Sequence, residues 1–93
     1  MGKCDPIAIQ EWLKKRYMLL FLRINERTDH AFAIVDLPYL PPNPLERPFD
    51  CKISISTPRQ AENDFLRMSD FDEGTTLFDS KGWEKRLLEI SHQ

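Results

Sequence analysis

The amino-acid sequence predicts a small α+β domain whose elements follow in the order α-β-β-β-α-α. Three observations indicate this fold class. A capped amphipathic helix comes first, two apolar runs joined by a polar insert follow, and an alternating strand precedes two further helical segments. We therefore expect a three-stranded antiparallel sheet with the helices packed mainly on one face. The length of 93 residues suits a single domain, 1–93.

The first helix is predicted over residues 6–16. Asp5 can accept hydrogen bonds from first-turn amides, and Pro6 is tolerated at the first helical position because its missing N–H would be unpaired there. Ile9, Trp12 and Leu13 recur at helical spacing and predict one buried face.

Two strands are predicted next, over residues 17–24 and 31–37. Both segments are apolar on both faces, and the polar stretch 25–30 separates them, which is typical of an antiparallel hairpin with a medium loop. Strands that are apolar on both faces are usually central and covered.

A proline-rich segment, 37–49, follows the hairpin and holds five of the seven prolines of the chain. Its PxxP spacing is that of a polyproline II ligand, but Glu46 stands where a common ligand form has a cation. We therefore expect a stiff ordered loop. Its apolar residues Tyr39, Leu40 and Leu45 are candidates for partner binding if they are exposed.

The third strand is predicted over residues 50–57, where apolar and polar residues alternate. Cys51, Ile53 and Ile55 fall on one face, whereas Lys52 and the serines fall on the other. This pattern indicates a half-exposed edge strand, which offers a pairing surface to a partner strand or to a second copy of the chain.

Two further helices complete the prediction. Thr57 and Gln60 form the ends of a capping box that starts a helix ending near residue 69. An acidic, turn-rich segment and a short extended piece at 75–78 follow. The last helix is capped by Asp79 or Ser80 and buries Trp83, Leu87 and Ile90.

Composition and residue spacing argue against several functional classes. The net charge of −2 gives no electrostatic reason to bind nucleic acid, and the longest apolar run, 17–22, is too short to span a bilayer. The histidines and cysteines lack metal-ligand spacing, and an attempted calcium loop from Asp70 fails because Gly74 and Lys81 occupy ligand positions. We therefore expect no metal, no cofactor, no catalytic residue and no enzyme activity.

The two cysteines, Cys4 and Cys51, do not form a disulfide framework by spacing, so a reduced chain in the cytoplasm is expected, with Cys51 as a small core residue. Lipidation at Gly2 and Cys4 would change this localisation to the membrane surface, but Pro6 stands where the myristoylation pattern has Ser or Thr.

The function predicted from these observations is non-catalytic protein–protein interaction, as an inhibitor, immunity-type protein, adaptor or complex subunit. The partner is another protein, and a homodimer through the edge strand 50–57 is included. The second half of the chain is mildly acidic, and an acidic surface suits basic protein partners. The residues proposed for this acidic face are Asp64, Asp70, Asp72, Glu73 and Asp79.

The alternative is a small nucleic-acid-binding protein. Its contacts would come from basic residues near the junction of the first helix and the hairpin, namely Lys14, Lys15, Arg16, Arg23 and Arg27. Binding to duplex and single strands at low salt separates the two functions, because phosphate contacts are strongest there.

Overall fold

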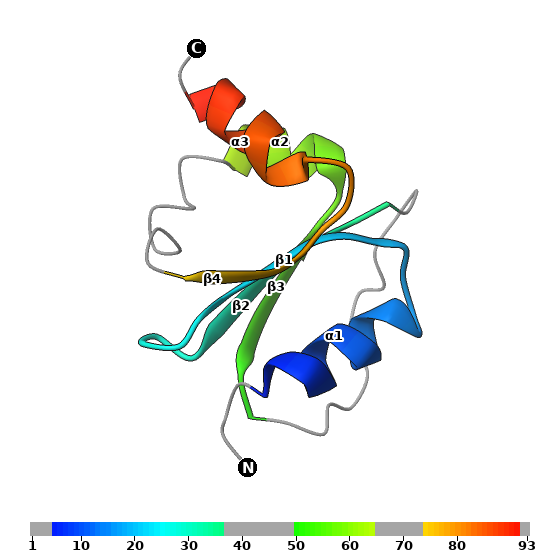
Figure 1. The fold of residues 1–93 in the computed structure, drawn as a ribbon, viewed down its shortest axis with the longest axis vertical. Helices are drawn as coiled ribbons and strands as arrows, with labels where there is room; N and C mark the ends of the chain where they lie inside the picture. The colour runs from blue at the N-terminus through cyan, green and yellow to red at the C-terminus, as the bar shows by residue number, and fades with distance from the viewer. Residues whose placement is uncertain (1–4, 37–49, 65–73, 92–93) are drawn as a thin grey trace.

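The computed structural model describes residues 5–36, 50–64 and 74–91. In chain order its elements are α1 (Pro6–Lys14), β1 (Leu19–Asn25), β2 (His30–Val35), β3 (Lys52–Ser56), α2 (Pro58–Asp64), β4 (Thr75–Asp79) and α3 (Trp83–Ser91). The strands form one four-stranded sheet in the order β3-β2-β1-β4 (Figure 1). The small α+β fold class is therefore confirmed. The predicted number of three strands is wrong, because Thr75–Asp79 forms a fourth strand of the sheet.

The sheet is mixed rather than antiparallel. β1 pairs antiparallel with β2 and with β4, but β2 and β3 run parallel. A parallel neighbour needs a connection that returns the chain to the starting end of the sheet, which takes about a dozen residues or more. The segment between Val35 and Lys52 is long enough for this return, so the prediction of a purely antiparallel sheet is wrong.

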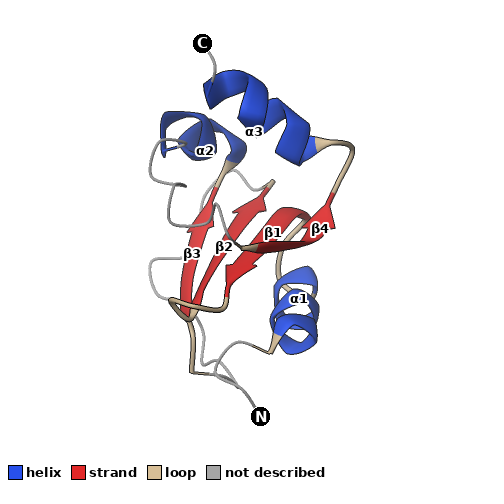
Figure 2. Cartoon of the chain, turned by 60° about the vertical axis from the view of Figure 1, so that its left-hand side comes forward, coloured by secondary structure: helices blue, strands red, loops and turns tan. Residues whose placement is uncertain are grey.

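Helices cover both faces of the sheet (Figures 1 and 2). On one face, the buried side chains of α1 (Ile9, Trp12 and Leu13) pack with Leu22 and Ile24 of β1. On the other face, Ala61 of α2 and Leu87 of α3 pack with Phe21, Phe32 and Ile34 of the central strands. The prediction that the helices lie mainly on one face is wrong, because β1 and β2 are apolar on both faces and each face requires a cover.

The predicted helix starts are confirmed by side-chain contacts. Oδ1 of Asp5 accepts hydrogen bonds from the amides of Ile7 and Ala8 at 3.2 and 3.4 Å. At α2, the amide of Gln60 donates to Oγ1 of Thr57 at 3.3 Å, and the amide of Thr57 donates back to Oε1 of Gln60 at 3.0 Å. This reciprocal pair is the capping box that the sequence predicts.

Candidate functional site

The candidate site is the outer edge of β3, defined by the five residues Lys52–Ser56. β3 lies at the end of the sheet, and among the described strands it pairs with β2 alone. The pairing is regular from Lys52, opposite His30, to Ser56, opposite Ile34. The predicted edge position of this strand is therefore confirmed.

The backbone of β3 points alternately toward β2 and away from it. The amide of Lys52 donates to the carbonyl of Asp29 at 3.0 Å, so the N–H and C=O groups of Lys52 face β2. In a parallel ladder the direction alternates from residue to residue, so Ser54 and Ser56 also face β2. The backbone N–H and C=O groups of Ile53 and Ile55 consequently point to the outer edge.

The two faces beside this edge differ in chemistry. Ile53 and Ile55 are partly buried and pack against the core cluster that includes α1. On the opposite face, Oγ of Ser54 lies 2.7 Å from Nε2 of His30 on β2, and Lys52 is exposed. A strand added at this edge would therefore meet apolar side chains on one face and polar side chains on the other.

The start of β3 is fixed at its junction with the β1–β2 turn. Asp29 is a non-glycine residue with a left-handed backbone, at φ 51°, and its carbonyl accepts the amide of Lys52. Asp is among the residues that tolerate this conformation.

Cys51 is buried beside Asp29 and is disulfide-bonded. The expectation of a reduced Cys51 is therefore wrong, although its place in the core is confirmed.

This bond bears on the predicted localisation, because disulfides persist mainly in oxidising surroundings. The cytoplasmic assignment rested on reduced cysteines and stays a prediction. No helix in the described part of the chain is both long enough and apolar enough to cross a membrane.

The opposite edge, β4, is less regular. Its pairing with β1 shifts register between Leu22 and Arg23, which marks a bulge. Bulges twist an edge away from further pairing. The ammonium group of Lys14 also lies over the ring of Phe78 on β4, 4.7 Å from the ring centroid. Of the two edges, β3 is the one better suited to accept another strand.

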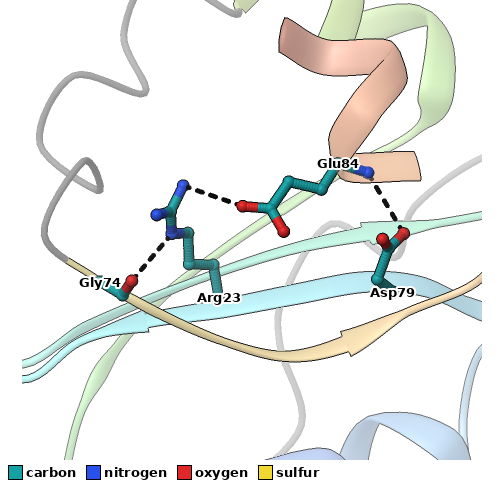
Figure 3. A network of polar contacts seen from close by, with 4 residues as sticks. All are labelled: Arg23, Gly74, Asp79 and Glu84. Carbon is teal, nitrogen blue, oxygen red and sulfur yellow. Dashed lines mark hydrogen bonds and ion pairs between the residues drawn. The ribbon is translucent and has the colours of Figure 1, made fainter. Parts of the chain in front are cut away.

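A polar network joins β1, β4 and α3 on the face covered by α2 and α3 (Figure 3). The side chain of Arg23 donates from Nε to the carbonyl of Gly74 at 3.1 Å, and its Nη1 lies 3.7 Å from a carboxylate oxygen of Glu84. Oδ1 of Asp79 accepts the amide of Glu84 at 3.2 Å. Gly82 directly precedes α3, with φ 75°, and has no side chain that could accept a hydrogen bond from the first turn of the helix. The carboxylate of Asp79 takes this role and caps α3.

We expect Asp79→Ala to lower the free energy of unfolding by about 1 kcal/mol, because an amide of the first turn of α3 loses its acceptor. Asp79→Asn keeps a carbonyl oxygen at this position and should retain most of the stability. Urea unfolding of both variants at neutral pH measures the difference. Equal losses in the two variants would show that the carboxylate acts through its charge and not as a cap.

The predicted basic residues do not form one surface. Lys14, Lys15 and Arg16 lie together at the end of α1, where the guanidinium of Arg16 stacks 4.7 Å from the Trp12 ring centroid. Arg23 points to the opposite face, toward Glu84. Arg27 lies in the turn after β1, about 20 Å along the strand from the α1 end. The three residues at the end of α1 are consecutive in the chain, and the fold adds neither Arg23 nor Arg27 to them.

The predicted acidic face and loop lie largely outside the described residues. This applies to Asp70, Asp72 and Glu73 and to the loop residues Tyr39, Leu40 and Leu45. Asp64 ends α2, and Asp79 caps α3. Within residues 5–36, 50–64 and 74–91, no group of three His, Cys, Asp or Glu side chains could hold a metal ion.

Sequence reasoning missed two contacts, one at the edge of β3 and one in the polar network of β1 and α3. The His30–Ser54 contact joins residues that are far apart in the chain, and the Arg23–Glu84 ion pair joins β1 to the last helix. The antiparallel arrangement expected for residues 50–57 would not have predicted the first contact. No family model, curated protein or solved structure matches the chain.

Proposed function

We propose that the protein is a non-catalytic protein-interaction module that binds an extended segment of its partner at the outer edge of β3. The observation that carries this proposal is the direction of the β3 backbone. Two residues, Ile53 and Ile55, point their N–H and C=O groups away from β2, at the end of a regular sheet. Strand addition uses such groups for affinity and the flanking side chains for specificity.

The flanking side chains favour an amphipathic partner segment. Side chains on one face of the added strand would lie beside Ile53 and Ile55, which adjoin the apolar core cluster. Those on the other face would lie beside Lys52 and Ser54, where polar or acidic groups are the better neighbours. The preferred segment therefore alternates apolar and polar residues.

Two other surfaces stay proposals within this function. The acidic residues around Asp70, Asp72 and Glu73 are candidates for contacts with a basic partner, and charge reversal at these three positions tests that contribution. Nucleic-acid binding is the alternative function. It would rest on Lys14, Lys15 and Arg16, because Arg23 and Arg27 lie elsewhere.

The test removes one outward N–H group without changing the ladder to β2. Ile53→Pro deletes the outward donor, and proline is tolerated on the open side of an edge strand. A displayed library of extended peptides is selected on sparsely immobilised wild-type protein, and the recovered peptides are then titrated against the variant. We expect peptides with alternating apolar residues, and at least about tenfold weaker binding to Ile53→Pro, since a lost backbone contact and a steric block together exceed about 1.4 kcal/mol.

The matched control is Ile53→Val, which trims the side chain but keeps the N–H group. It should bind the selected peptides within about threefold of wild type, a difference of about 0.7 kcal/mol. Circular dichroism and thermal unfolding establish that each variant is folded, and Ile55→Pro replaces Ile53→Pro if the latter is not. Recovery of no peptide, or of peptides that bind the proline variant equally well, would overturn the proposal.

A further inference from the structure

The sequence of β3 complements itself when it is read in the opposite direction. Along the strand the residues are Lys52, Ile53, Ser54, Ile55 and Ser56. In an antiparallel pair of two such strands centred on Ser54, each Ile53 lies opposite Ile55 of the other copy. Ser54 then lies opposite Ser54, and Lys52 lies opposite Ser56.

We infer that the edge of β3 binds the β3 edge of a second copy, so that two four-stranded sheets become one sheet of eight strands. The inference rests on the proposed function and names the partner of the same site. A two-fold axis passes between the two Ser54 residues. Such a closed, isologous arrangement is the commonest symmetry of soluble oligomers.

The direction of the backbone selects this register. Only Ile53 and Ile55 within β3 point their polar groups outward, so an added strand must place its own outward residues against these two. Centring on Ser54 satisfies this condition for both residues in both copies and uses all five residues of the strand. Each Ile53–Ile55 pair then exchanges two backbone hydrogen bonds, as hydrogen-bonded antiparallel pairs do.

The side chains in this register do not repel one another. Apolar Ile53 and Ile55 meet across the axis on the face of the core cluster that includes α1. Each Lys52 faces a neutral Ser56, and the two lysines of the dimer lie at opposite ends of the ladder, about 13 Å apart along the strands. This distance exceeds a Debye length of about 8 Å at physiological salt. The net charge of −2 adds little repulsion between copies.

The experiment uses the two-fold axis. In the inferred register the Ser54 residues form a non-hydrogen-bonded pair with Cα atoms about 4.5 Å apart, which lies within the range that a disulfide bridges. Ser54→Cys should therefore form a disulfide-linked dimer under mild oxidation. Lys52→Cys is the matched control, because Lys52 is exposed on the same face and lies opposite Ser56, so its own copy is about 13 Å away. We expect crosslinking of Ser54→Cys to be at least about tenfold faster, since pairing raises the effective concentration of the two thiols.

Mass spectrometry of proteolytic fragments assigns the link to the introduced thiols and separates it from the bond at Cys51. Sedimentation of the wild type over a concentration range should show a dimer, and the double variant Ile53→Pro/Ser54→Cys should lose the rapid crosslink. Equal crosslinking of Ser54→Cys and Lys52→Cys, or a dimer that Ile53→Pro leaves intact, would overturn the inference. A monomeric wild type that still binds selected peptides through Ile53 would overturn the dimer alone and leave the proposed function standing.

Discussion

Replacing Phe21 by alanine is expected to lower the free energy of unfolding by about 3–5 kcal/mol, the usual cost of a large aromatic cavity. Phe21 is fully buried at the centre of β1, between Ile34 of β2 and Asp79 of β4. Its side chain belongs to the cluster that holds Ala61 of α2 and Leu87 of α3 against the sheet. The substitution therefore loosens both helices of that face at once.

This loss is a large part of the total for a domain of this size, which is typically about 5–15 kcal/mol. Urea unfolding followed by circular dichroism measures it, and the midpoint of thermal unfolding should fall by roughly 4–8 °C for each kcal/mol. Ile7→Ala is the matched control. Ile7 is 72% exposed on α1, so its truncation should change stability by less than about 0.5 kcal/mol. A small effect at Phe21, similar to that at Ile7, would contradict the packing described for this face.

Cys51→Ser is expected to lower the free energy of unfolding by about 2–4 kcal/mol, the usual contribution of a disulfide. Cys51 is disulfide-bonded and buried, and it comes directly before the first residue of β3. Loss of the bond releases a constraint on the unfolded chain, and a serine hydroxyl in place of the buried sulfur adds a desolvation cost. Thermal unfolding under non-reducing conditions measures the change.

Chemical reduction supplies the control for this prediction. Reductant should destabilise the wild-type protein by a similar amount and should leave the Cys51→Ser variant unchanged, because that variant has no bond at this position to break. Cys51→Ala removes the same bond without introducing a hydroxyl, so its comparison with Cys51→Ser separates the loss of the bond from the desolvation cost. If reductant leaves the wild type unaffected, the bond does not form in solution or does not contribute to stability.

Local signals in the sequence predicted the parts of the fold that depend on neighbouring residues. Asp5 and the Thr57–Gln60 capping box begin their helices as expected. The alternation of Ile53 and Ser54 correctly places these side chains on opposite faces of β3, but Ser56 at the end of the strand is buried, so the serine face is not the exposed one. These features are set within one or two turns of chain, where residue type and spacing carry the physical information.

The arrangement of the elements in space was less predictable. The parallel direction of β3 depends on the course of the segment after Val35, and the prolines in it indicate stiffness but no direction. β4 is only five residues long and follows a turn-rich segment, so its pattern is weak. For the candidate site, the edge position of β3 was predicted correctly. The contact between His30 and Ser54 could not be predicted, because it depends on the parallel register of β2 and β3.

The sheet order also has a consequence for the folding of the chain. β1 and β2 are neighbours in sequence and can pair as a hairpin early, because closing a short loop costs little entropy. Both outer strands join through long-range pairings, His30 with Lys52 and Ile24 with Thr75, and such contacts form late. We therefore expect the strand proposed to bind a partner to be among the last to join the sheet. A partner that binds only the completed sheet would stabilise it, so partner binding and completion of the native fold would be coupled. Slower hydrogen exchange at the amides of β3 in the presence of the partner would report this coupling.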